Sequence, residues 1–301
     1  MLPERPRGLN GPQTAALACM MEVMCPKPGN VSPGRPFRYI NAMSFLASAL
    51  GLVEAFADGY GGENASVGRM VEKAALVTKG WVDRNTNLGM VLLLAPLVKA
   101  SFAGPVDRES VRAVLDDLDE DDSRRVYSAI RISAPEGLGR SEKHDVHGSA
   151  PPLLEAMKLA SSWDSVAGEY ASGYGITFNM TAPRLAGLWR EGHSLGDCIL
   201  QTYLALLAEV PDTLVARKLG RDAAENISAG AQAIMESGGC FTAEGREKIA
   251  AFDSSLSHPD NLMNPGTTAD LTAAGIFVFL REELSVSGLP QVLERWEEWR
   301  S

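Results

Sequence analysis

Residues 66–82 read SVGRMVEKAALVTKGWV, and this stretch indicates which kind of secondary structure builds the chain. Its apolar residues recur at steps of three and four positions, which places them on one face of an α-helix. That face consists of Val67, Met70, Val71, Ala74, Ala75 and Val77. Ser66 stands directly before it, where a side-chain oxygen can cap the first turn. The stretch therefore predicts an amphipathic helix.

The same periodicity returns along most of the chain. It predicts further helices over residues 14–24, 43–58, 87–102, 108–118, 122–133, 152–174, 194–209, 222–237, 242–252 and 265–284. No stretch shows the sustained two-residue alternation that is typical of half-buried strands. None of the breaks resembles a flexible linker between domains. We expect an all-α fold with a tail over residues 1–13 and a single compact multi-helix domain over residues 14–301.

Composition and charge exclude several kinds of partner. The chain has 301 residues, of which 45% are hydrophobic and 22% charged, so a sizeable core is expected. A net charge of −10 argues against nucleic acid, because binding to its backbone needs clustered cations. The longest apolar runs, 90–98 and 271–280, reach about half of a membrane span, and the first residues lack the apolar core of a signal peptide. Four cysteines without a Cys-x-x-Cys pair indicate reduced thiols. We expect a cytoplasmic protein without a membrane partner, whose apolar helices permit a homodimer.

Glu22 and the loop PKPGN at residues 26–30 form the first candidate site. Glu22 falls in the last turn of an apolar predicted helix, where the helix dipole disfavours a carboxylate. The two prolines stiffen the loop, Gly29 would let the backbone approach a ligand, and Lys27 would contact a phosphate. A proline-rich turn with a solvated lysine is the alternative interpretation.

Asn85 and Asn87 form the second candidate, at the start of the very apolar predicted helix 87–102. Their oxygens suit Mg²⁺, and their amides suit the hydroxyls of a sugar. Capping of the helix by these side chains is the alternative.

Asp145 lies in the third candidate, the Gly-rich segment 137–145, and could transfer a proton. An exposed charged loop is the alternative. The acidic stretch 116–122 before it is expected to be a solvated connection between helices.

The fourth candidate combines Asp212 and Thr213 with Arg217 and Lys218 one turn later. An Asp after a proline usually caps or turns a helix. The neighbouring hydroxyl and cations also suit a corner that binds metal and phosphate.

The fifth and most specific candidate is NPGTTADLTAA at residues 264–274. Asn264 is expected to cap the helix, and Gly266 leaves its first amides uncovered, which attracts anions. Asp270 nevertheless lies close to the same terminus. An anionic ligand and a carboxylate share such a place when a cation joins them, so the segment predicts Mg²⁺ bound together with substrate phosphates. A well-capped core helix is the alternative.

These segments, in this order, resemble the triphosphoribosyl-dephospho-coenzyme A synthase family. The matching strings are Glu22-Val23, PKPGN (26–30), NTNLG (85–89), Asp145-Val146, PDT (211–213) and NPGTTADLTAA (264–274). The resemblance implies a helical fold and a reaction in which ATP loses adenine. The triphosphoribosyl group passes to a hydroxyl of 3′-dephospho-coenzyme A, while Mg²⁺ and cationic side chains hold the triphosphate.

The resemblance also implies that the domain over residues 14–301 is catalytic, with its active site at helix termini in a central cleft, and it implies site residues. Glu22, Asp145, Asp212 and Asp270 are candidate catalytic carboxylates, and Glu22, Asp212 and Asp270 are the candidate metal ligands. The candidate contacts to substrate and phosphate are Lys27, Gly29, Asn30, Asn85, Asn87, Thr213, Lys218, Asn264, Gly266, Thr267 and Thr268.

Two segments depart from the members that serve citrate lyase. Those usually carry a Gly-Ser-His-Lys-Asp-Met-like segment and a Thr-His-Lys-Gly, where this chain has RPFRY (35–39) and TNLG (86–89). The pattern is more similar to a branch found in archaea and methylotrophic bacteria. A related phosphoribosyl or diphosphate transfer in the biosynthesis of a one-carbon cofactor of methanopterin or methanofuran type is therefore an alternative. A metal-dependent nucleotide hydrolase is a second, and a non-catalytic nucleotide-binding protein a third.

Overall fold

The computed structural model describes residues 8–57, 66–133, 151–257 and 260–296, and its regular elements there are all helices. They are α1 Gly11–Met24, α2 Ala42–Ala57, α3 Val67–Val82, α4 Leu88–Ser101, α5 Arg108–Asp116, α6 Glu120–Ser133, α7 Leu153–Ala160, α8 Ser165–Ser172, η3 Thr177–Thr181, α9 Ala182–Arg190, α10 Leu195–Glu209, α11 Thr213–Leu219, α12 Arg221–Glu236, η4 Gly239–Phe241, α13 Ala243–Ser255, α14 Gly266–Val286 and α15 Leu289–Glu294. In these residues the extended pairing is limited to one isolated bridge between Ser32 and Arg35. The predicted all-α fold is confirmed.

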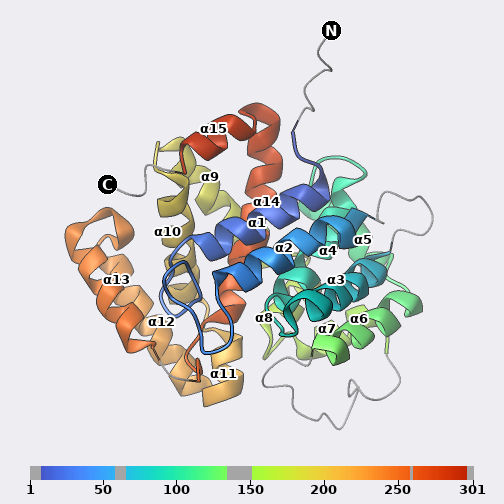
Figure 1. Cartoon of the computed structure of the whole chain (residues 1–301), viewed down its shortest axis with the longest axis horizontal. Coiled ribbons are helices and arrows are strands. Elements are labelled where there is room, and N and C mark those ends of the chain that lie inside the picture. The colour runs from blue at the N-terminus through green and yellow to red at the C-terminus, as the bar shows by residue number, and fades with distance from the viewer. Residues whose placement is uncertain (1–7, 58–65, 134–150, 258–259, 297–301) are drawn as a thin grey trace.

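Helix α14 lies at the centre of the molecule (Figure 1). It packs against α1, α4, α9 and α10, and its residues from Thr267 to Leu280 are buried almost without interruption. In Figure 1 the helices α3, α6, α7 and α8 lie on one side of it and α10, α12 and α13 on the other. One cluster of buried apolar side chains runs from α1 to α15. The ends of several helices can therefore meet around the start of α14.

Helix α1 begins earlier than expected. The side chain of Asn10 accepts a hydrogen bond from the backbone of Gln13 (2.9 Å), and the side chain of Gln13 accepts one from the backbone of Asn10 (3.1 Å). This reciprocal cap satisfies two of the free donors at the helix start. Residues 11–13 are thus part of α1 and not of a tail.

A proline inside α4 fixes how α8 packs against it. Pro96 has no N–H, so the carbonyl of Leu92 one turn earlier loses its helical partner. The hydroxyl of Tyr170 donates to that carbonyl (2.7 Å). The hydroxyl of Tyr174 donates to the next carbonyl, that of Leu93 (2.7 Å). Two buried phenols of one segment therefore tie α8 to the apolar helix that leads to the cleft.

The single helix predicted over residues 152–174 is wrong, because the chain forms two helices there, α7 and α8. Apolar spacing continues through the break, but the carboxylate of Asp164 starts a new helix by accepting from the amides of Val166 (2.9 Å) and Ala167 (3.2 Å). Gly173 ends α8 in the left-handed region at φ +66°. Periodicity alone does not reveal a change in helix direction.

Five helical elements were not predicted, namely η3, α9, α11, η4 and α15. Of these, η3 is a π-turn that depends on the buried side chain of Glu169. Its carboxylate accepts hydrogen bonds from the amides of Ile176 (2.7 Å) and Thr177 (2.9 Å) and from the Thr177 hydroxyl (2.5 Å). This cap spans seven to eight residues, more than the three-residue spacing of the usual capping patterns, so it was not predicted.

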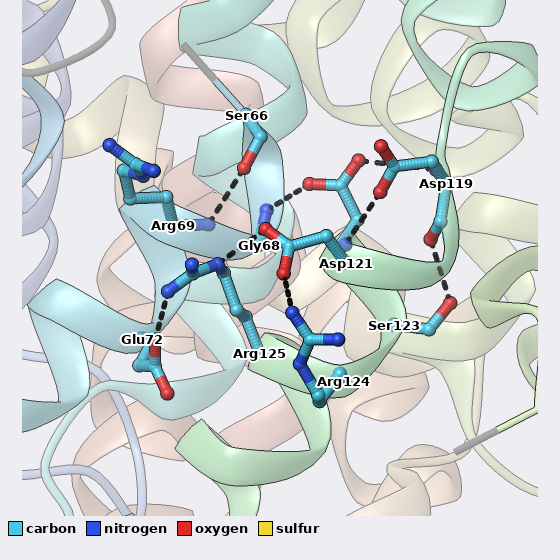
Figure 2. A network of polar contacts seen from close by, with 10 residues as sticks. Ser66, Gly68, Arg69, Glu72, Asp119, Asp121, Ser123, Arg124 and Arg125 are labelled. Carbon is cyan, nitrogen blue, oxygen red and sulfur yellow. Dashed lines mark hydrogen bonds and ion pairs between the residues drawn. The ribbon is translucent and has the colours of Figure 1, made fainter. Parts of the chain in front are cut away.

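The acidic stretch at 116–122 joins α5 to α6 and is mostly exposed, as expected, but its last residue is buried. Asp122 is 5% exposed and accepts from the amide of Gly68 at 2.6 Å. Figure 2 shows the surrounding polar network, in which Arg125 bridges Asp121 and Glu72 at 2.6 and 2.7 Å. The hydroxyl of Ser123 accepts from the first amide of α7 (2.8 Å). The network thus fixes α7, which forms a wall of the cleft described below.

No single helix among the described residues is both long and apolar enough to cross a membrane. The bent pair α10 and α11 reaches the required length and hydropathy only together. Most of α10 is buried in the core, which accounts for its apolar character.

Candidate active site

A cleft of about 840 Å³ opens where α1 ends and where α4, α11 and α14 begin. Nine of the predicted site residues line it: Glu22, Asn30, Asn85, Asn87, Lys218, Asn264, Gly266, Thr267 and Asp270. The predicted residues Lys27, Gly29, Asp212, Thr213 and Thr268 are not part of its lining. Asp145 lies outside the described residues. The cleft lies at helix termini near the molecular centre, as expected.

Asp270 projects from α14 into the cleft. Among the described residues, its carboxylate accepts no hydrogen bond and forms no ion pair. Burial raises the pKa of Asp270 well above its usual range, and the carboxylates of Glu22 and Asp212 raise it further. Helix α4 approaches so closely that a Cβ on Gly89 would lie 1.9 Å from an oxygen of Asp270. Only glycine at position 89 leaves room for this acid, which the sequence analysis did not anticipate.

Glu22 lies beside Asp270 and is paired with Lys27. The Lys27 ammonium is 2.9 Å from the Glu22 carboxylate and also donates to the backbone carbonyls of Glu22 and of Cys25 (2.7 Å for Cys25). These contacts use its three N–H donors, and its side chain is fully buried. Burial raises the pKa of Glu22, and the Lys27 charge opposes this rise. Lys27 therefore holds Glu22 in place, which differs from the phosphate contact predicted for it.

Asp212 joins α11 to α14. One carboxylate oxygen accepts from the amides of Leu214 (2.9 Å) and Val215 (3.0 Å), and the other from the amide (2.7 Å) and hydroxyl (2.8 Å) of Thr268. These bonds use all four lone pairs of the carboxylate. The geometry thus assigns Asp212 and Thr268 to positioning, in contrast to the metal, catalytic and substrate contacts predicted. The hydroxyl of Thr213 is likewise engaged, with the amide of Ser165 (3.2 Å) and the hydroxyl of Thr267 (3.3 Å).

Gly29 serves the packing of its loop. Its φ is +77°, and a Cβ there would lie 2.8 Å from the ring of Pro265. The predicted close approach is therefore to α14 and not to a ligand. Next to it, Asn30 donates to the hydroxyl of the buried Tyr203 (2.8 Å), which donates to the carbonyl of Pro28 (2.9 Å). This arrangement holds Asn30 at the cleft wall.

Three asparagines along the cleft differ in their bonding. Asn85 accepts from the amide of Leu88 (3.1 Å) and so caps α4. The side-chain nitrogen of Asn87 and the side-chain oxygen of Asn264 are buried and have no protein partner. Asn264 does not cap α14, because Pro265 occupies the capping position. Buried polar groups are normally satisfied, so these two atoms indicate where a bound molecule completes the site.

The cleft suits Mg²⁺ shared with phosphates. No group of three or more His, Cys, Asp or Glu side chains among the described residues is arranged to hold a metal ion, and the predicted set of three carboxylates is not assembled. Glu22 and Asp270 remain, because each lines the cleft and each raises the local negative charge. Mg²⁺ is commonly bound by one or two carboxylates together with substrate phosphates. The unpartnered oxygen of Asn264 adds a neutral ligand of the preferred kind.

Cationic side chains line the cleft although the whole chain is acidic. They are Arg38, Lys79, Arg84, Arg217 and Lys218. Arg217 pairs with the cap residue Asp164 (2.6 Å), and its charge opposes the raised pKa of Asp270. Arg217 and Lys218 belong to the fourth candidate of the sequence analysis, whereas Arg38, Lys79 and Arg84 were not predicted as site residues.

The remaining wall is apolar and comes from α6, α7 and α8. It includes Tyr127, Leu153, Met157, Trp163 and Val166. The cleft therefore combines two carboxylates, several cations and an apolar wall.

Comparison with known proteins assigns this helical architecture to a class. The crystal structure of a protein from Archaeoglobus fulgidus, assigned as a triphosphoribosyl-dephospho-coA synthase, superposes with a TM-score of 0.60. The two sequences are 32% identical, and the alignment covers 79% of this chain and 98% of the other. Residues 11–288 match the family model of the ATP:dephospho-CoA triphosphoribosyl transferases. The chain belongs to this family of transferases.

Relatives from pseudomonads carry a corresponding assignment. The protein of Pseudomonas fluorescens assigned as a 2-(5''-triphosphoribosyl)-3'-dephosphocoenzyme-A synthase is 27% identical over 212 residues, which are 70% of this chain and 65% of that protein. A homologue from Pseudomonas putida is 26% identical over 70% of this chain and 67% of its own length. The match thus spans about two thirds of these relatives.

Proposed function

We propose that this protein transfers the triphosphoribosyl group of ATP to a hydroxyl of 3′-dephospho-coenzyme A, with release of adenine and dependence on Mg²⁺. The observation that carries the proposal is the pair of carboxylates, Glu22 and Asp270, at the floor of the cleft. Asp270 has no protein partner in the described residues although its environment disfavours a negative charge. A bound cation would resolve this conflict, and family membership supplies the donor and acceptor.

The triphosphate fits the side of the cleft formed by α11 and α14. Arg217 and Lys218 extend from α11, and Gly266 and Thr267 of the first turn of α14 line the same cleft. Helix N-termini and cations favour phosphate groups. When bound, Mg²⁺ would neutralise phosphate charge and hold the triphosphate in one geometry.

The reaction exchanges one bond at the anomeric carbon of the ribose. The bond to adenine breaks and its electron pair leaves with the purine, while the acceptor oxygen forms the new bond. The acceptor hydroxyl loses a proton and the leaving purine takes one up, so the proton count is balanced. Positive charge develops on the ribose in the transition state, and the acidic floor favours it electrostatically. Asp145 stays the predicted base for the hydroxyl.

The proposal is tested by incubating the protein with ATP, Mg²⁺ and 3′-dephospho-coenzyme A and following the products by mass spectrometry. Adenine together with an adduct that carries the triphosphoribosyl group would support the transfer. Adenine without an adduct would contradict it in favour of a hydrolase. No adenine from a folded protein that binds ATP would contradict it in favour of a different donor, as in the one-carbon cofactor alternative. Chelation of Mg²⁺ should abolish both products.

A further inference from the structure

A second group of cations lies in the cleft, apart from those on α11. Arg38 and Tyr39 occupy the tip of a tight turn in which the amide of Phe37 donates to the carbonyl of Ile40 (2.8 Å). Arg84 comes from another loop, directly after Asp83, which ends α3 in the left-handed region at φ +54°. The guanidinium carbons of Arg38 and Arg84 lie 5.1 and 5.5 Å from the centre of the Tyr39 ring. One aromatic ring therefore brings two cations from separate loops together.

In the part of the chain that the structure describes, the two arginines have little counter-charge, since the carboxylate of Asp83 acts on Arg84 only at a distance. Among the described residues neither guanidinium forms an ion pair, whereas the neighbouring Lys79 is paired with Asp83 at 2.6 Å. The tyrosine ring attracts each cation only weakly, and the two cations repel one another. A bound anion would offset this repulsion and could accept hydrogen bonds from both guanidinium groups.

The position of this group differs from that of the donor triphosphate. Arg217 acts on Asp270 from α11, while Arg38 belongs to the loop between α1 and α2 and Arg84 to the loop between α3 and α4. The two sets of cations thus belong to different walls of one cleft. Its volume of about 840 Å³ lies toward the upper end of the range for a single small ligand.

We propose that Arg38 and Arg84, held by Tyr39, form a separate anion subsite that binds the diphosphate of the acceptor nucleotide. The assignment rests on the proposed function for the identity of the acceptor. Arginine suits this ligand because its planar donors match phosphate oxygens in pairs. The subsite would select an acceptor with a diphosphate and hold its hydroxyl toward the acidic floor.

The test uses Arg38→Ala, Arg84→Ala and the double variant, with Arg221→Ala as the matched control. Arg221 is an exposed arginine on α12 that does not line the cleft. Calorimetric titration measures binding of 3′-dephospho-coenzyme A and of ATP with Mg²⁺ separately, and kinetics give the KM of each. We expect each single variant to weaken acceptor binding about tenfold, the loss of one charge-assisted contact, and to leave ATP binding within about twofold. Arg221→Ala should change neither.

The outcomes separate this proposal from the proposed function. If the wild-type protein forms the adduct but the variants keep the acceptor KM, or weaken ATP instead, the subsite assignment is overturned and the transfer stands. If no adduct forms but the variants lose affinity for 3′-dephospho-coenzyme A alone, the subsite stands and the transfer does not. A wild-type protein that fails to bind 3′-dephospho-coenzyme A would overturn the subsite directly.

Discussion

Asp270 shows why a residue can be found from the sequence while its chemistry cannot. The string NPGTTAD places an acid close to a helix start, and the structure puts that acid in the cleft. Asp212 is an equally plausible acid in the sequence, yet all its lone pairs bond protein groups. What distinguishes the two carboxylates is the number of donors nearby, which depends on segments distant in the chain.

We predict that Asp270→Asn reduces adenine release by about two orders of magnitude or more, since it removes the charge that would bind the cation. The unfolding free energy near pH 7, measured in EDTA by urea denaturation, should stay equal or rise. The reason is that the raised pKa marks a folded state that disfavours the ionised side chain. Asp222→Asn, an exposed change on α12, is the matched control and should retain activity. A variant that unfolds more easily would show Asp270 to be structural.

Lys27→Met should destabilise the protein by about 3–5 kcal/mol, because it leaves Glu22 buried without its partner. The exposed pair of Lys248 and Glu244 has the same separation, 2.9 Å, so Lys248→Met is a matched control expected to change stability little. Urea unfolding of both variants measures the difference. Equal effects would mean that burial does not strengthen the Lys27 contact.

At the scale of elements, the ends of the helices determine which polar atoms line the site, whereas the middles of the helices form the core. The middles of α3, α10 and α14 follow from apolar spacing, and Ser66 and Ser194 cap α3 and α10 as such residues usually do. Asn264 was expected to cap α14 in the same way but does not, since its side-chain oxygen has no protein partner. A cap that is expected but not formed leaves a polar atom available to a ligand.

Tyr170→Phe should lower the unfolding free energy by about 1–3 kcal/mol, because the carbonyl of Leu92 freed by Pro96 loses its buried donor. Tyr174→Phe is the matched comparison and should cost less, since the carbonyl of Leu93 keeps the amide one turn later as a donor. Chemical denaturation of both variants gives the two values. A larger loss for Tyr174→Phe would contradict the role given to Pro96.

At the scale of the whole molecule, burial of carboxylates makes stability depend on pH. The pKa of Asp270 is raised, chiefly by burial, and among the described residues its carboxylate accepts no hydrogen bond that would favour the ionised form. At a pH above the ordinary value near 4, the folded protein therefore holds a proton on Asp270 that the unfolded chain releases. Stability from this group is complete below that pH and is lost as the pH rises through the raised value.

We predict that the unfolding free energy in EDTA falls between about pH 5 and pH 8, and that Asp270→Asn lessens this fall. The net charge of −10 acts in the same direction, so the difference between wild type and variant, not the slope alone, measures the contribution of Asp270. Mg²⁺ with ATP should restore stability to the wild type at pH 8 by binding the folded state. A wild type that becomes more stable from pH 5 to pH 8 would contradict the prediction.

The sequence by itself determined the helical class, the extent of the main helices and the positions of Glu22, Asn87, Asn264 and Asp270 around one site. These follow from local causes, namely apolar spacing within a helix and caps within a few residues. Only the tertiary structure showed that Lys27 is buried in an ion pair with Glu22 and that every lone pair of the Asp212 carboxylate accepts a hydrogen bond. The tertiary structure also showed that Arg38 and Arg84 both lie against the ring of Tyr39. The burial of Lys27 and the bonds from Thr268 to Asp212 depend on groups far apart in the chain, so no local pattern records them.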